Sequence, residues 1–246
     1  MKGFRWQIAA GCALLGISCL IYALHYVIFR DVHHILIFML GDVAFLPVEV
    51  LMVTLIIDQM LKAREKKAML NKLNMVIGVF FSKTGIRLLK DLSAFDRNTE
   101  KNREPLIFMD DWNKQAFLKA SAMIKDIPFD INSRNENLEN LKYSLNNEKD
   151  FLLTLLGNPN LLEHENFTDL LWAVTHLSEE LALRKDLNKL SEADHNHISV
   201  DIKRAYTLLL AQWFAYLGHL KSNYPHLFSL AARTNPFDPN ASVEFR

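Results

Sequence analysis

Two long apolar runs open the chain. Trp6 to Phe29 carries no formal charge, and a helix of this length, at about 1.5 Å per residue, is roughly 36 Å long. A second apolar run extends from Ile35 to Ile57 and is interrupted by Asp42, Pro47 and Glu49. Because about 20 apolar residues cross the hydrocarbon core of a bilayer as a helix, the pattern predicts a hairpin of two membrane spans.

After Ile57 the apolar positions continue without a proline and keep spacings near three and four residues. They are Leu70, Leu73, Ile77, Phe80, Leu88, Leu92 and Phe95. This spacing predicts one amphipathic helix over residues 58–97 that continues from the second span. The polar stretch from Asp96 to Glu104, followed by Pro105, predicts a loop after this juxtamembrane helix.

Residues 105–233 show helical periodicity throughout. The expected helices lie at about Asp111 to Lys125, up to Leu156, at 166–185, at 193–221 and at 225–232. Ser133-Arg-Asn-Glu136 has the pattern of a capping box and predicts the start of the helix that ends near Leu156. Two prolines make residues 234–246 an extended tail. No stretch alternates as a strand would, so the sequence predicts an all-α chain with a cytoplasmic helical domain.

Charge is balanced in total but not along the chain. The 28 basic and 28 acidic residues divide into a neutral hairpin, an excess of basic residues over 58–97 and an excess of acidic residues beyond. A basic collar follows the second span: Lys62, Arg64, Lys66, Lys67 and Lys72. Positive charge marks the cytoplasmic ends of spans, so both termini are expected in the cytoplasm. The collar fits topology determination, and contact with lipid head groups is the second interpretation.

Small residues mark two candidate surfaces for helix packing or oligomerisation. They are Gly11, Cys12 and Gly16 in the first span, and Gly78, Ser82 and Gly85 in the juxtamembrane helix. Small side chains allow membrane helices to approach closely, and a glycine within a helix costs up to about 1 kcal/mol relative to alanine. At the second surface, self-association and packing against later helices of the same chain are equally consistent with the pattern.

Asp42 and Glu49 are the candidate intramembrane polar site. Charged residues within a span are expensive and usually functional, and these two share a helix face with Pro47 between them. Folding the hairpin places Asp42 opposite Tyr22, with His25 one turn away. Three interpretations follow: a hydrogen-bonded Asp42 that only packs, an ion or proton path in an oligomer, and a contact with another protein's membrane helix.

Catalytic motifs are absent from the sequence. It contains no GxGxxG or Walker glycine loop and no Gly-x-Ser-x-Gly elbow. His176 and Glu179 stand three residues apart on an expected helix and could meet one metal ion, but no second matching pair and no HExxH accompanies them. The acidic helical domain also lacks the basic face of a nucleic-acid binder. We therefore expect no enzyme activity, no metal, no cofactor and no nucleic-acid partner.

Three segments resemble a family of uncharacterised bacterial two-span inner-membrane proteins. They are FLPVEVLMVTLIIDQMLKAREKKAMLNKLNMVIGVFFSKTG, HENFTDLLWAVTHLSEELALRKDL and YPHLFSLAARTNPFDPNAS. The resemblance implies a location in a bacterial inner membrane. It implies no activity and assigns no functional residues.

The leading hypothesis is a membrane-anchored, non-enzymatic scaffold or adaptor whose cytoplasmic helical domain binds another protein, and self-association is expected. The first alternative is a small ion- or proton-conducting assembly that uses Asp42 and Glu49. The second is a metal-dependent cytoplasmic enzyme centred on His176 and Glu179.

Overall fold

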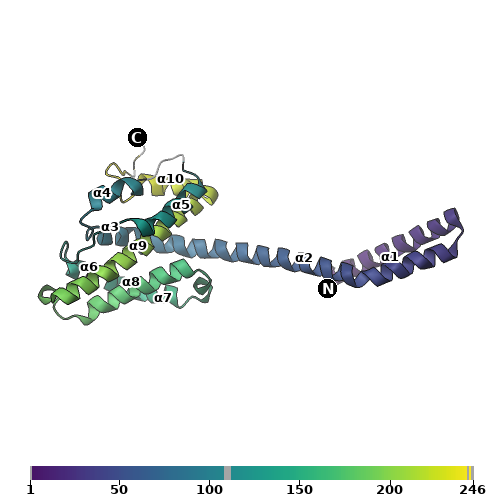
Figure 1. The fold of residues 1–246 in the computed structure, drawn as a ribbon, viewed down its shortest axis with the longest axis horizontal. Coiled ribbons are helices and arrows are strands. Elements are labelled where there is room, and N and C mark those ends of the chain that lie inside the picture. The colour runs from purple at the N-terminus through teal and green to yellow at the C-terminus, as the bar shows by residue number, and fades with distance from the viewer. Residues whose placement is uncertain (1, 108–111, 243, 245–246) are drawn as a thin grey trace. The chain divides into compact units, whose positions relative to one another are not determined.

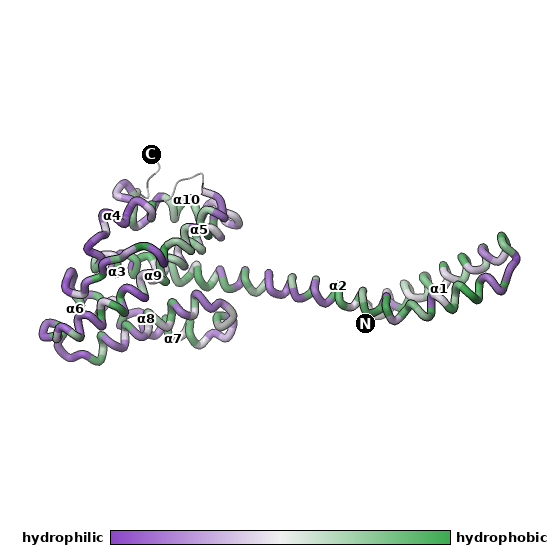
Figure 2. Tube along the Cα trace, in the orientation of Figure 1, coloured by the Kyte–Doolittle hydropathy of each residue, from purple (hydrophilic) through white to green (hydrophobic). Residues whose placement is uncertain are grey.

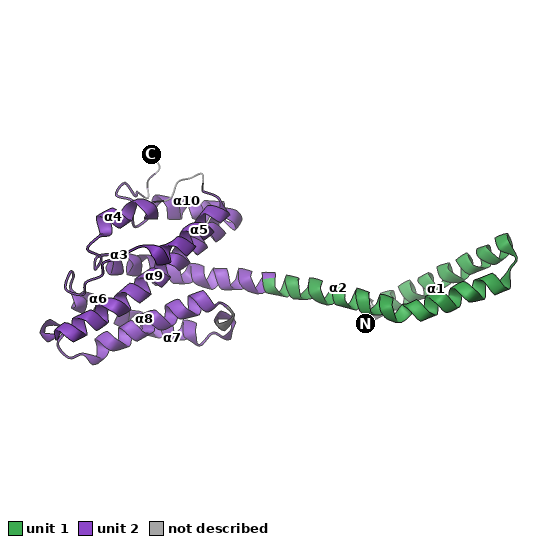
Figure 3. Ribbon diagram, in the orientation of Figure 1, with its two compact units in different colours: residues 1–66 green, residues 67–246 purple. Residues whose placement is uncertain are grey.

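A computed structural model describes residues 2–107, 112–242 and 244 (Figure 1). The chain divides into two compact units, residues 1–66 and 67–246 (Figure 3). The boundary falls within helix α2, which runs from Val32 to Phe80. This boundary falls inside the predicted juxtamembrane segment 58–97, most of which belongs to the second unit.

The first unit is a helical hairpin. Helix α1 runs from Lys2 to Phe29, and α2 begins two residues later. Arg30 makes the reversal with a φ of 49°, and Asp31 Oδ1 accepts hydrogen bonds from the backbone N–H groups of His33 and His34. A carboxylate that accepts the first free N–H groups of a helix is an N-terminal cap. The hairpin loop is thus shorter than the sequence pattern suggests.

The apolar side chains of the first unit are exposed. Figure 2 shows the high hydropathy of its two helices. Each contains a segment that is long and apolar enough to cross a membrane, and no residue of the most apolar stretch of either segment is buried. Helix α2 continues through Pro47. In water such a surface would be unusually apolar for a monomer.

The second unit is a bundle of helices around α9. The helices that follow α2 in this unit are the π-helix Phe81–Gly85, α3 Ile86–Ser93, α4 Thr99–Arg103, α5 Lys114–Met123, α6 Leu138–Asn147, α7 Lys149–Leu156, α8 Glu165–Leu183, α9 Glu192–Asn223 and α10 Pro225–Arg233. Short 3₁₀ turns connect them at Glu104–Leu106, Ile124–Asp126, Pro159–Glu163 and Leu187–Lys189. The described residues contain no strand, only an isolated bridge between Asp96 and Ile131. The all-α prediction is confirmed.

Helix α9 packs against α3, α5, α8 and α10. The core also includes the end of α2, where Leu73, Ile77 and Phe80 are buried on one face. Their spacing of four and three residues follows the helical period. The apolar face of the juxtamembrane helix is therefore covered by later helices of its own chain.

The predicted helix start at Ser133 is wrong. Asn137 caps α6 and accepts hydrogen bonds from the N–H groups of Glu139 and Asn140. Ser133 is buried instead, and its hydroxyl lies 2.7 Å from His195 Nδ1 on α9. The helix is also interrupted at Glu148, between α6 and α7. Ser133, which the local sequence pattern predicts as a helix cap, instead contacts His195 on a distant helix.

Two expected irregular regions also differ. Residues 99–103 form α4 within the expected loop, because the buried Asp96 accepts hydrogen bonds from Asn98 N and Asn102 Nδ2. In the expected tail, Asn235 and Phe237 are buried. Asn235 Nδ2 donates to the backbone oxygen of Leu106. Of the helix expected from Asp111, the first residue lies outside the described residues, and α5 begins at Lys114.

Candidate functional site

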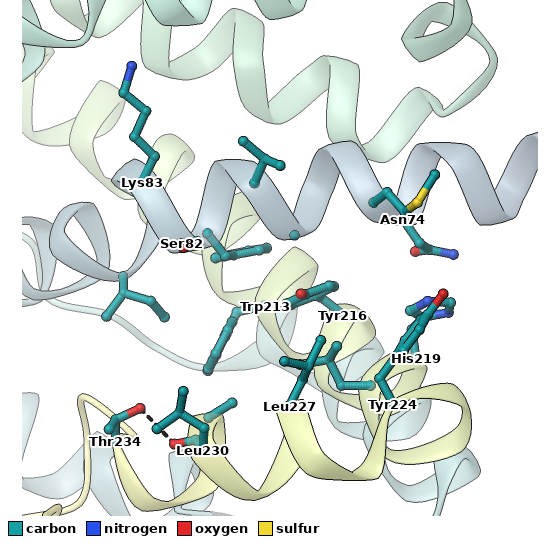
Figure 4. A pocket seen from close by; sticks show the side chains of 17 residues that line it. Asn74, Ser82, Lys83, Trp213, Tyr216, His219, Tyr224, Leu227, Leu230 and Thr234 are labelled. Atoms are coloured by element: carbon teal, nitrogen blue, oxygen red, sulfur yellow. Dashed lines mark hydrogen bonds between the residues drawn. The ribbon is translucent and has the colours of Figure 1, made fainter. Parts of the chain in front are cut away.

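An apolar groove of about 590 Å³ lies within the second unit. Figure 4 shows side chains from the end of α2 on one side and from α10 on the other, with those of α9 between them. The lining residues of this apolar groove include Met75, Gly78, Val79, Ser82, Trp213, Tyr216, His219, Tyr224, Leu227 and Leu230. Several of the apolar members are exposed, among them Met75, Val79, Leu227 and Leu230.

Aromatic rings form the floor of the groove. Phe81 lies with its ring centroid 5.4 Å from that of Tyr216, in a stacked arrangement, and 5.0 Å from that of Trp213. Trp213 is only 3% exposed, and its Nε1–H has no hydrogen-bond partner among the described residues. A buried N–H without an acceptor costs free energy. The Nε1 atom is itself buried, so the described residues leave this donor unpaired inside the aromatic cluster.

Tyr216 and His219, two of the titratable side chains that line the groove, favour their neutral forms near pH 7. Burial raises the pKa of the Tyr216 hydroxyl, and the neighbouring Tyr224 adds to this effect. Burial lowers the pKa of His219, as does the positive charge of Lys114. These shifts move both groups away from their ordinary values of about 10 and 6.5 towards the neutral form. The groove therefore suits an apolar occupant.

The predicted glycine surface of the juxtamembrane helix meets side chains of the same chain. A Cβ at Gly78 would lie 2.7 Å from Tyr216 Oη, and one at Gly85 would lie 2.5 Å from a ring carbon of Phe81. Ser82 lines the groove. Close intramolecular packing is therefore sufficient to account for both glycines.

The small residues of the first span have a different environment. A Cβ at Gly11 or at Gly16 would meet nothing within 4 Å, and Cys12 is exposed. This surface remains a predicted packing site that the chain itself does not cover.

The candidate intramembrane residues are not brought together. Asp42, Glu49 and Tyr22 are exposed, and neither carboxylate forms a hydrogen bond or ion pair within the described part of the chain. His25 instead stacks on His34, with 5.8 Å between ring centroids. The predicted contact of Asp42 with Tyr22 or His25 is absent from the hairpin as described.

The basic collar is exposed along α2. Lys62, Arg64, Lys66, Lys67 and Lys72 all lie at the surface. Lys62 Nζ lies 2.7 Å from Asp58 Oδ2, four residues earlier. The other four side chains are also exposed on the helix surface. An exposed ion pair such as that of Lys62 contributes little to the free energy of unfolding.

A second polar site lies between α8 and α9, and of its members only His176 is among the candidate residues identified from the sequence. We call it the histidine–carboxylate cluster, and it consists of His176 and Glu180 on α8 and His197 and Asp201 on α9. Each pair is separated by four residues, so both side chains lie on one helix face. His176, His197 and Asp201 each place a ligand atom within 4.8 Å of the others, an arrangement that could hold a metal ion.

His176 does not pair with Glu179, the partner considered in the metal-dependent alternative. Glu179 is exposed, whereas Glu180 and Asp201 lie 4.0 and 3.5 Å from His176 Nε2. The packing of α9 against α8 determines which α8 side chains lie beside His197 and Asp201, and these are His176 and Glu180. The sequence signal was a repeated spacing, His-x₃-Glu followed by His-x₃-Asp on the next long helix.

Arginine side chains orient both carboxylates of the cluster. Arg184 pairs with Glu180 and also reaches Asp194, at 3.3 Å. The hydrogen bond from Arg184 lowers the pKa of Glu180, burial opposes this, and the charges of Arg184, His197 and His176 lower it further. Arg204 Nη1 lies 3.3 Å from Asp201 Oδ1. Glu180 is therefore ionised near neutral pH.

Comparison with known proteins identifies two family models. Residues 2–61 match the model described as "MJ1433, N-terminal helical domain", and residues 69–233 match "Uncharacterized protein MJ1433, C-terminal helical domain". A relative from Methanocaldococcus jannaschii, "Uncharacterized protein MJ1433", is 44% identical over 243 residues, which is 99% of this chain and 97% of the relative. No solved structure matches.

These matches refine the sequence-based resemblance. Membership of an uncharacterised helical family is confirmed. The boundary between the two units lies in the short gap between the two matched regions. The relative is archaeal. A bacterial family and its two membrane spans are not shown by the matches.

Proposed function

The chain belongs to the family of MJ1433-like helical proteins, and we propose that it is a non-enzymatic adaptor anchored in a cytoplasmic membrane. In this proposal residues 6–29 and 32–57 cross the bilayer as a hairpin, and the helical domain at residues 67–246 binds a partner protein at the cytoplasmic face.

The exposed apolar surface of the hairpin carries the proposal. Leu14, Leu20 and Leu40 are each about 70% exposed (68%, 71% and 71%), and no segment of the described chain covers them. Burial of apolar surface contributes about 25 cal/mol per Å², so a lipid environment would stabilise these helices strongly. The basic collar would then lie on the cytoplasmic side.

The apolar groove supports the binding role. It is bounded by α2 and α10 and has an aromatic floor, so its shape and chemistry fit an apolar helix face, a common mode of recognition. We propose a partner protein's amphipathic helix as the occupant. Its apolar side chains would cover Met75, Val79 and Leu230, which are exposed in the groove.

Accessibility labelling tests the anchor and its orientation. Cys12 and Cys19 are replaced by alanine, and a single cysteine is introduced at His33 or at the exposed Tyr143. A membrane-impermeant maleimide applied to intact cells should label His33→Cys, and Tyr143→Cys only after permeabilisation. The reverse pattern would overturn the orientation, and release of the protein by alkaline carbonate would overturn the anchor.

Photo-crosslinking in native membranes tests the groove. A photoreactive amino acid at Leu230 should give a discrete product with one protein, identified by mass spectrometry, and the same group at Tyr143 should not. The variant Met75→Lys should suppress the product at Leu230. Products with lipid alone would contradict a protein partner, and products of twice the chain's mass would instead identify a second copy.

Ion conduction is a second candidate because Asp42 and Glu49 are unpartnered carboxylates in a predicted span. It requires proton or cation flux in liposomes that contain the purified chain. Loss of flux in Asp42→Asn or Glu49→Gln would replace the adaptor proposal with a conducting assembly. Absence of flux would remove the conducting alternative.

A further inference from the structure

We propose that the histidine–carboxylate cluster binds one divalent transition-metal ion through His176 Nε2, His197 Nε2 and Asp201 Oδ2. The site would be independent of the apolar groove, because it lies between α8 and α9 and shares no residue with the groove. The ion would join the two longest helices of the second unit.

The distances between donor atoms match those around a bound metal. Two ligand atoms that each lie about 2.1 Å from a tetrahedral ion are about 3.4 Å apart. Asp201 Oδ2 lies 3.5 Å from His176 Nε2 and 3.3 Å from His197 Nε2. The two imidazole nitrogens lie within 4.8 Å of each other, so a modest movement of the exposed histidine side chains would let all three atoms meet one ion.

Asp201 provides an independent indication that a ligand is bound here. The residue is 2% exposed, and its Oδ2 forms no hydrogen bond within the described part of the chain. Arg204 approaches the other oxygen, Oδ1. A buried carboxylate oxygen without a partner is costly, and here it is directed towards two imidazole nitrogens. A metal ion would satisfy this oxygen and both nitrogens together.

The donor set selects the class of ion. Two imidazoles and one carboxylate suit Zn²⁺ and its neighbours in the first transition series, whereas Mg²⁺ and Ca²⁺ prefer oxygen ligands alone. The side chains of His176 and His197 are 45% and 51% exposed, so an ion can enter from solvent. Three protein ligands leave a fourth position for water or for Glu180, whose oxygens lie 4.0 and 3.6 Å from the two imidazoles.

Neighbouring cations do not oppose the site. Arg184 is paired with Glu180 and Asp194, and Arg204 with Asp201. Their charges are therefore offset by carboxylates. The second interpretation of the geometry is that protonated His176 and His197 simply form ion pairs with Asp201, and this interpretation predicts no affinity for metal.

The experiment uses the purified full chain in detergent, freed of metal by a chelator and titrated with Co²⁺. We expect one Co²⁺ per chain, visible absorption bands of a four-coordinate ion, and displacement by Zn²⁺. His176→Gln and His197→Gln should each weaken binding by more than about 100-fold, beyond the effect of losing an outer-shell partner. His226→Gln on α10 should leave binding unchanged.

Thermal unfolding provides a second measurement. It uses histidine variants only, so it leaves the buried Asp201 in place. Zn²⁺ should raise the melting temperature of the wild-type chain and of His226→Gln, and it should not raise that of either cluster variant. No binding at micromolar metal, or equal binding by all four proteins, would overturn the site. Destabilised histidine variants without any metal effect would establish the ion-pair interpretation.

Discussion

Glu148 is a buried carboxylate at the start of α7 that contacts the juxtamembrane segment. It accepts hydrogen bonds from Thr84 Oγ1 at 2.7 Å and from Arg87 Nη2 at 2.6 Å, and Lys83 Nζ lies 4.0 Å away. Burial alone would raise the pKa of Glu148. The two hydrogen bonds and the charges of Arg87 and Lys83 outweigh it and hold the pKa below its usual value.

Removing this charge should destabilise the second unit. We expect Glu148→Gln to lower the free energy of unfolding near pH 7 by about 1–2 kcal/mol, because hydrogen bonds to an ionised group are stronger than those to an amide. Since the folded pKa is lowered, the wild-type advantage is complete above the unfolded pKa and disappears as pH falls through the folded value.

Urea unfolding of the detergent-solubilised chain at several pH values checks this prediction. Glu179→Gln, at an exposed position within α8, is the control and should change little. A difference between wild type and Glu148→Gln that persists at the lowest pH would contradict the electrostatic explanation.

Gly85 and Gly78 should respond differently to alanine. A new Cβ at Gly85 would meet the buried rings of Phe80 and Phe81, which cannot move, and overpacking typically costs about 1–3 kcal/mol. At Gly78 it would meet only the hydroxyl end of Tyr216, and a gain in helix propensity of up to about 1 kcal/mol offsets the contact. Thermal unfolding should therefore separate the two variants, and equal melting temperatures would contradict the packing described.

At the scale of elements, a π-helix allows the juxtamembrane helix to enter the core. Phe80 and Phe81 are adjacent in sequence and both are buried, and the π-helix Phe81–Gly85 begins at the second of them. Regular helical geometry points neighbouring side chains about 100° apart. The wider π turn changes the register, so that Leu88, Leu89 and Leu92 of α3 face the same core.

The true start of α6 is also testable. Asn137→Ala should lower the free energy of unfolding by about 1 kcal/mol, because it removes the acceptor for two free N–H groups. Glu136→Ala should change it by less than about 0.5 kcal/mol, as is usual for exposed positions. A larger effect at Glu136 than at Asn137 in denaturant titrations would restore the capping box predicted from sequence.

At the scale of the whole molecule, the two units match separate family models and have opposite surface character. We expect a fragment of residues 67–246 to remain folded and monodisperse in buffer without detergent, because its core closes within that range. The full chain should require detergent. Gel filtration and circular dichroism check both statements, and aggregation of the fragment would show that the first unit is needed to cover its surface.

Local pattern was sufficient to predict the long helices, but not the short α4 or the start of α6. The apolar runs, the spacing of Leu73, Ile77 and Phe80, and the end of a helix near Leu156 all reflect interactions within a few residues, and such interactions can be predicted from the sequence alone. The all-α class and the positions of α8 and α9 followed from them. The structure of the loop containing Asp96 and of the tail containing Phe237 could not be predicted in this way, because residues distant in sequence bury these side chains.

The sequence by itself determined where the long helices lie and which apolar faces need cover, since both depend on side-chain chemistry at fixed spacing. Tertiary structure alone decided what covers them. It brought Tyr216 over Gly78, drew Ser133 away from the helix end to meet His195, and placed His197 and Asp201 beside His176. The reason is physical: a helix sets the direction of each side chain, but only the packing of a second helix determines the atoms that it meets.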